Sequence, residues 1–146
     1  MPRTPGSGPA ALTAAVTAAD PCPCGRGLPY GGCCGPFHQG TAAPATAELL
    51  LRSRYSAFAV GDAAYLLRSW HPATRPARLR LDPGLRWAGL EVLATDRGGP
   101  WHSEGTVAFI ARYSDGAEAG ELRETSRFTR ESGAWHYVGP VPTTGT

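Results

Sequence analysis

The chain has 146 residues, the size of one ordinary domain with at most a small appendage. Hydrophobic residues make up 42% of it and charged residues 18%, which is typical of a soluble globular protein and excludes a chain that is disordered throughout. No apolar run approaches the roughly 20 residues that cross a bilayer, so no membrane span is predicted. The net charge of +2 gives no support for a protein that binds duplex DNA.

The first 19 residues are rich in proline and glycine and then in alanine and threonine. Their only stronger hydrophobic residues are Leu12 and Val16, too few for the apolar region of a signal peptide. We therefore predict a disordered leader over residues 1–19 and a cytoplasmic protein. Residues 141–146 are predicted to form a disordered tail.

All four cysteines lie within 13 residues, in the spacing C-x-C-x8-C-C. Tetrahedral Zn²⁺ is bound by four soft thiolates at about 2.3 Å, and two close cysteine pairs separated by a turn can surround one ion. Four thiolates leave no coordination position open, so the site would be structural. The predicted zinc ligands are Cys22, Cys24, Cys33 and Cys34.

Two other interpretations of the cysteines stay open. The first is a pair of disulfides, although adjacent cysteines are strained partners and cross-pairing needs an oxidising compartment. The second is that His38, four residues after Cys34, replaces one thiolate with a ring nitrogen.

The segment from Pro21 to Gly35 resembles the SEC-C zinc motif, named for the C-terminus of the SecA translocation motor. The motif has the pattern C-P-C-G-S-G followed by a second cysteine pair, and here Arg26 stands in place of its serine. In SecA the motif is a small knuckle that docks onto a chaperone and onto ribosomes. The resemblance therefore implies a zinc knuckle over residues 20–40 that docks onto a protein or ribonucleoprotein partner.

The next part of the chain predicts two helices after a Gly/Ala/Pro connector over residues 35–44. Thr46 is a good N-cap for a helix whose apolar residues recur at helical spacing and which ends at Gly61. Asp62 caps a second helix, from Ala63 to about Trp70, and His71-Pro72 stops it. The apolar face of the first helix consists of Ala47, Leu51, Tyr55 and Phe58.

After an Arg-rich, Pro-punctuated loop over residues 73–83, the hydrophobic period changes to two. Four strands are predicted, over residues 87–95, 106–113, 120–130 and 135–138. Short turn signals such as Asp115-Gly116 and Ser132-Gly133 separate neighbouring strands and indicate an antiparallel meander. The predicted fold class is α+β, with the helices covering one face of a curved sheet.

Several further strings resemble the uncharacterised bacterial YchJ-like family. They are Arg52-Ser53-Arg54-Tyr55-Ser56-Ala57-Phe58, Tyr65-Leu66, Trp70-His71-Pro72, the strand from Val107 to Tyr113, Glu124-Thr125-Ser126-Arg127-Phe128 and Gly133-Ala134-Trp135-His136-Tyr137. The resemblance implies a cone-shaped domain of the nuclear-transport-factor-2-like (NTF2-like) type over residues 45–140, behind a SEC-C knuckle. It also implies a possible homodimer through the open face of the sheet.

The strongest candidate for a buried polar site is Glu124. Strand alternation places it with Leu122, Ser126 and Phe128 on the face under the helices, where a carboxylate is costly unless it is paired. Arg54 on the first helix is its natural counter-ion, either in a structural ion pair or in the floor of a ligand pocket. The candidate pocket residues are Arg54, Tyr55, Trp70, His71, Arg112 and Glu124.

Neither an acid/base couple nor a nucleic-acid surface is strongly indicated. His71 is weighed as a general base and Asp62 as an acid, but a packing role and an N-cap explain them. The four tryptophans with arginines could bind single-stranded nucleic acid, although packing explains them as well. Two hypotheses remain: a zinc-dependent docking module that is not an enzyme, or a domain that binds or converts a small molecule in its cavity.

Overall fold

A computed structural model of the chain describes residues 16–142. Its N-terminal part is a small knuckle in which Pro21 forms a β-bridge with Pro29, followed by the 3-10 turn η1 (Tyr30–Gly32) and the short helix α2 (Gly35–Gln39). Most of the predicted leader lies outside the described residues. The last residues of the predicted leader are part of the knuckle, because the carbonyl of Ala18 accepts a hydrogen bond from the amide of Gly31.

Helix α2 occupies the start of the segment that was predicted to be a Gly/Ala/Pro connector. Pro36 stands in its first turn, where the missing amide hydrogen costs nothing, and Gly40 ends it with a left-handed φ of 82°. The prediction for residues 35–39 is therefore wrong.

The two predicted helices are confirmed as α3 (Ala47–Val60) and α4 (Ala63–Arg68). The Thr46 side chain accepts a hydrogen bond from the Leu49 amide, and Gly61 ends α3 with a φ of 80°. Helix α4 ends two residues earlier than predicted. The chain leaves it because the amide of Tyr137 bonds the carbonyl of Ser69 and the amide of His71 bonds the carbonyl of Tyr137.

The predicted meander is also confirmed. The strands β1 (Leu85–Arg97), β2 (Glu104–Asp115), β3 (Glu118–Glu131) and β4 (Ala134–Pro140) form one antiparallel sheet in the order β1-β2-β3-β4. Each strand is longer than predicted, because pairing continues into the turns. Register shifts interrupt the β1–β2 pairing twice and the β3–β4 pairing once, and such bulges bend a sheet so that it can curve around a helix.

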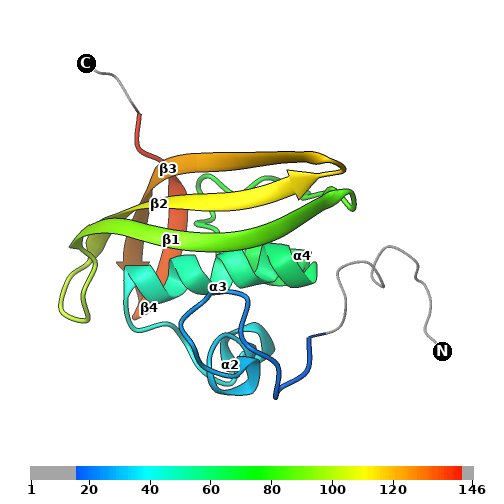
Figure 1. Cartoon of the computed structure of the whole chain (residues 1–146). Helices are drawn as coiled ribbons and strands as arrows, with labels where there is room; N and C mark the ends of the chain where they lie inside the picture. Colours follow the sequence, from blue (N-terminus) through cyan, green and yellow to red (C-terminus); the bar gives the residue numbers. More distant parts are fainter. Residues whose placement is uncertain (1–15, 143–146) are drawn as a thin grey trace.

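Helix α3 is the centre of the molecule. The sheet lies over one side of it and the knuckle with α2 lies against the other side (Figure 1). The four cysteines share one buried cluster with Leu50, Leu51, Tyr55 and several strand residues, so the knuckle has no separate core. No helix within residues 16–142 has the length and apolar character of a membrane span.

Candidate functional site

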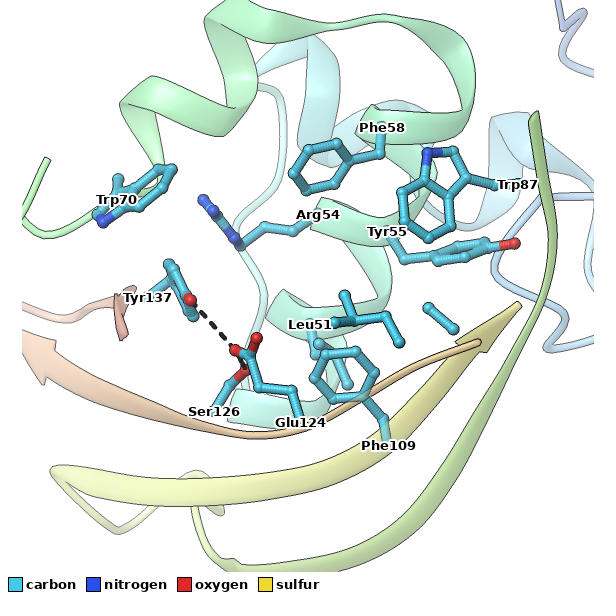
Figure 2. Close-up of a pocket in the computed structure, with 12 residues that line it drawn as sticks. Leu51, Arg54, Tyr55, Phe58, Trp70, Trp87, Phe109, Glu124, Ser126 and Tyr137 are labelled. Carbon is cyan, nitrogen blue, oxygen red and sulfur yellow. Dashed lines mark hydrogen bonds between the residues drawn. The ribbon is translucent and has the colours of Figure 1, made fainter. Parts of the chain in front are cut away.

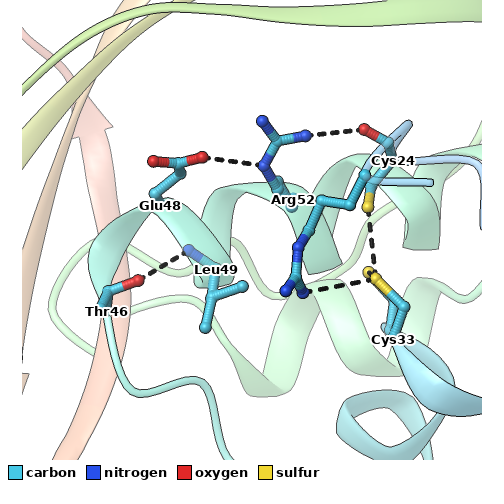
Figure 3. A network of polar contacts seen from close by, with 8 residues as sticks. Cys24, Cys33, Thr46, Glu48, Leu49 and Arg52 are labelled. Atoms are coloured by element: carbon cyan, nitrogen blue, oxygen red, sulfur yellow. Dashed lines mark hydrogen bonds and ion pairs between the residues drawn. The ribbon is translucent and has the colours of Figure 1, made fainter. Parts of the chain in front are cut away.

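The four cysteine sulfur atoms converge on one point. They are buried, and all four lie within 4.8 Å of one another. The Sγ atoms of Cys24 and Cys33 are 3.5 Å apart (Figure 3). Those of Cys33 and Cys34 are 3.9 Å apart. A tetrahedral ion with sulfur ligands at about 2.3 Å requires sulfur atoms about 3.8 Å apart, so the spacing fits a metal and is too long for a disulfide.

The electrostatics of the cluster favour a bound cation. Interaction with the Cys22 thiol, followed by burial, raises the pKa of Cys24 to about 11. The neighbouring thiols of Cys22 and Cys24, and then burial, also raise the pKa of Cys34. Four buried thiolates this close together repel one another unless a cation compensates their charge, which is what a metal ion does. Nη1 of Arg26 lies 3.6 Å from the Cys33 sulfur and adds a further positive charge.

His38 lies beside the cluster but is not placed as a ligand. Its Nε2 bonds the carbonyl of Ser53 at 2.8 Å, and its Nδ1 bonds the hydroxyl of Tyr30. The ring also packs against Tyr65. Because both nitrogens are engaged, His38 fastens α2 to α3 instead of replacing a thiolate.

Side chains on one face of α3 hold the knuckle in place. Arg52 donates from Nη1 to the carbonyl of Cys24 at 2.9 Å and from Nε to Glu48 at 3.0 Å (Figure 3). The hydroxyl of Ser56 lies 3.5 Å from the Cys22 sulfur. Arg52 and Ser56 belong to a string that the sequence flagged only by resemblance, since contacts across 28 and 34 residues leave no local signal.

The other side of α3 borders a cavity of about 240 Å³ between the helix and the sheet (Figure 2). Residues from α3, from the chain after α4 and from all four strands line it. They are Leu51, Arg54, Tyr55, Phe58, Trp70, Trp87, Phe109, Ala111, Leu122, Glu124, Ser126 and Tyr137. Four predicted pocket residues, Arg54, Tyr55, Trp70 and Glu124, are among them.

Arg54 and Glu124 do not form the direct ion pair that one interpretation predicted. Nη1 of Arg54 donates to the carbonyl of Leu66 at 2.8 Å and to the hydroxyl of Ser69 at 2.7 Å. Its guanidinium carbon lies 5.0 Å from the ring centre of Trp70 and 4.4 Å from that of Tyr137. Burial lowers the pKa of Arg54 to about 10.

The carboxylate of Glu124 is held by two hydroxyl groups. Its Oε2 accepts hydrogen bonds from Ser126 at 2.6 Å and from Tyr137 at 3.2 Å (Figure 2). Tyr137 therefore stands between the predicted partners, with its ring against Arg54 and its hydroxyl on Glu124. Burial, and then the Glu124 charge, raise the pKa of Tyr137 to about 12.

Tyr137 is not among the pocket residues predicted from the sequence. A usable signal was present, because Tyr137 lies two residues after Trp135 in a predicted strand and so points to the same face. Trp135 is buried and Tyr137 pairs with the buried Phe128.

The predicted pocket residues His71 and Arg112 do not line this cavity. Nε2 of His71 lies 2.9 Å from Glu131, and its Nδ1 accepts a hydrogen bond from the Ala73 amide in the turn after α4. Arg112 alternates with the cavity residue Ala111 and points to the opposite face of the sheet, where it bonds Glu91 and Glu121 at the surface. The acid candidate Asp62 caps α4 through the Tyr65 amide.

The four tryptophans do not share a surface. Trp70 and Trp87 line the cavity, and Trp135 is buried with its indole nitrogen bonded to the carbonyl of Ala45. Trp101 is 91% exposed and stands apart from the others. This distribution fits packing and a cavity better than a stacking platform for single-stranded nucleic acid.

Comparisons with known proteins agree with this geometry. Residues 46–140 match the middle NTF2-like domain of YchJ. The chain is 62% identical over 118 residues to a UPF0225 protein of Streptomyces coelicolor, covering 81% of this chain and 92% of that protein. It is 54% identical over 122 residues to a UPF0225 protein of Xanthomonas oryzae, covering 82% and 92%.

Two solved structures have the same fold. One is a SEC-C motif containing protein from Rhodopseudomonas palustris, with a TM-score of 0.72 and 32% identity over 84% of this chain and 98% of that chain. The other is a SEC-C motif containing protein from Psychrobacter arcticus, with a TM-score of 0.69 and 26% identity over 88% and 86% of the two chains. These matches confirm the predicted α+β fold of the NTF2-like type. The chain belongs to the YchJ-like UPF0225 family, whose SEC-C motif here supplies the four converging cysteines.

Proposed function

We propose that this protein binds a small molecule in the cavity between α3 and the sheet, and that a structural Zn²⁺ on the four cysteines fixes the outer side of the same helix. The zinc proposal rests on the donor set. Four buried thiol sulfurs at tetrahedral spacing select Zn²⁺ or iron, and they leave no open position for a reacting water.

Zinc bound there would supply folding energy to a knuckle that has few apolar residues of its own. The ligands are Cys22, Cys24, Cys33 and Cys34, and Arg26 would offset part of their charge. Because thiols persist unpaired only under reducing conditions, the same proposal places the protein in the cytoplasm.

The observation that carries the small-molecule proposal is the state of Arg54 and Glu124. Both groups line an otherwise apolar cavity, yet no ion pair joins them among the described residues. Buried charges are costly unless something pairs with them, and a few converging polar groups in an apolar cavity are typical of a ligand site. Had Glu124 been locked to Arg54 in a filled core, the same residues would support only a structural role.

Native mass spectrometry of the protein purified from cytoplasm, without added metal, tests both parts. We expect one Zn²⁺ per chain and a small-molecule adduct that survives gentle ionisation and disappears on acid denaturation. The adduct should be lost in Arg54→Met and retained in Arg112→Met, which removes an arginine from the outer face of the sheet. A mass four hydrogens lower, from two disulfides, would contradict the zinc site, and an empty wild-type cavity would contradict the ligand site.

Docking through the knuckle is a second proposed function, and one observation favours it. The hairpin between the cysteine pairs presents the apolar side chain of Leu28, which is 38% exposed. A partner protein or ribonucleoprotein would cover this side chain. Photo-crosslinking from position 28 in cells should capture one defined partner, and crosslinking that is no stronger than from an exposed outer-sheet position such as 123 would contradict docking.

A further inference from the structure

We infer that the ligand of the cavity is a one-ring organic acid with a hydrogen-bond donor next to its carboxylate. The inference rests on the proposed small-molecule function and names the chemistry of the ligand. Four features of the cavity each determine one part of the ligand. They are its volume, its aromatic end, its buried cation and its free carboxylate oxygen.

The size of the cavity limits the body of the ligand. An apolar cavity of about 150 Å³ is known to hold benzene, so about 240 Å³ holds one ring with a short polar substituent. A whole nucleotide could not be enclosed within this volume.

One end of the cavity is lined by aromatic side chains that can pack against a ligand ring. Tyr55, Phe58 and Trp87 gather there, and Figure 2 shows them on the side away from Tyr137 and Glu124. The ring of Trp87 lies 5.9 Å from that of Tyr55 at an interplanar angle of 73° and 5.8 Å from that of Phe58 at 52°. These tilted rings offer edges and faces to an aromatic ligand.

The other end contains a buried cation in need of an anion. Arg54 is only 5% exposed, and no carboxylate lies within 4.0 Å of it among the described residues. Nη1 is already used, and the rings of Trp70 and Tyr137 flank the guanidinium, so Nε and Nη2 remain as donors. A ligand carboxylate would accept from them and compensate a charge that burial disfavours.

Glu124 sets the second polar group of the ligand. Its Oε2 is saturated by Ser126 and Tyr137, whereas Oε1 has no hydrogen-bond partner among the described residues. Arg54 and Glu124 both contact Tyr137, one at its ring and the other at its hydroxyl, and the proposed head group would bond both (Figure 2). A hydroxyl or amine on the carbon beside the carboxylate would donate to Oε1 while the carboxylate faces Arg54.

A cationic amine alone fits less well. It would pair with Glu124 but would leave the guanidinium of Arg54 uncompensated, with a second positive charge nearby. The deeper burial of Arg54 makes its compensation the larger requirement, so the acid is favoured.

Isothermal titration calorimetry of the full zinc-loaded chain with four matched probes tests the inference. The probes are mandelate, phenylacetate, 2-phenylethanol and 2-phenylethylamine, which share a ring and differ in the head group. We expect mandelate to bind tightest, phenylacetate next, and the neutral alcohol and the amine weakest. In Arg54→Met, both acids should bind about 10- to 100-fold more weakly, the loss expected for a charged hydrogen bond.

Two variants separate the ligand class from folding defects. Glu124→Gln should bring the ratio of mandelate to phenylacetate affinity towards one, and Arg54→Lys, which keeps the charge, should retain the preference for acids at reduced affinity. Arg112→Met should match the wild type.

The inference would be overturned if the alcohol or the amine bound more tightly than the acids, or if the acids bound with a dissociation constant above about 1 mM. An adduct of another class in native mass spectra would overturn it while leaving small-molecule binding intact.

Discussion

The two sides of α3 use polar side chains in opposite ways. On the knuckle side, Arg52 bonds both a backbone carbonyl and Glu48, and the Ser56 hydroxyl contacts the Cys22 sulfur. On the cavity side, Arg54 retains two free donors after its protein contacts. Polar groups that bond other groups of the chain stabilise the fold. A buried group that still has free hydrogen-bond donors or acceptors indicates a ligand site.

The largest expected effect is on the knuckle side. Cys34→Ser, or treatment with a chelator, should lower the free energy of unfolding by more than about 4 kcal/mol, because the buried cluster would lose the proposed Zn²⁺. Chemical unfolding with parallel zinc analysis measures the change. A variant that loses zinc but keeps wild-type stability would show that the knuckle does not brace α3.

Leu51→Ala on the cavity side should have the next largest effect. Leu51 is 6% exposed and borders space that is already open, so the loss should be about 2–3 kcal/mol, in the lower part of the range for such changes. The enlarged cavity should bind a bulkier ring, such as a naphthyl acid, better than the wild type does. Calorimetry with both ring sizes checks this, and unchanged selectivity would mean that the ring does not reach Leu51.

Tyr137→Phe is expected to act more weakly on stability, at about 1 kcal/mol, because it removes one hydrogen bond to Glu124 and keeps the ring against Arg54. Its effect on binding should concentrate on the donor group: mandelate should lose more affinity than phenylacetate. An equal loss for both acids would indicate that Tyr137 positions Arg54 instead of Glu124.

Arg112→Met should have the smallest effect. Its partners Glu91 and Glu121 lie with it on the exposed outer face of the sheet, where ion pairs contribute little. Thermal unfolding should not change measurably. Analytical ultracentrifugation of the same variant also tests the homodimer that the resemblance implies, since a dimer through this face would weaken.

Local patterns were sufficient to predict most of the fold. Thr46 and Gly61 delimit α3, and the turn residues between strands fix the meander, because caps and short turns depend on neighbouring residues. Helix α2 was missed because its five residues contain proline and glycine, which are read as breakers unless their position in the first turn and at the end is known.

The candidate site was less predictable because it joins distant segments. Alternation placed Glu124 correctly under the helices, but the contact of Arg54 with Tyr137 spans most of the domain and replaced the expected ion pair. Arg112 sits one position out of phase with the cavity-lining Ala111, so the period of two already argued against it. His71 follows the helix that was expected to deliver it, and the early end of α4 directs it to Glu131.

If the two sides of α3 have separate roles, two neighbouring variants on this helix should have different effects. Arg52→Met and Arg54→Met remove the same side chain two positions apart, one facing the knuckle and one facing the cavity. Zinc release to a chromogenic chelator and mandelate affinity would be measured for both. Arg52→Met should release zinc faster and bind mandelate almost normally. Arg54→Met should release zinc almost normally and bind mandelate about 10- to 100-fold more weakly. Equal effects of the two variants on both readouts would contradict separate roles for the two sides.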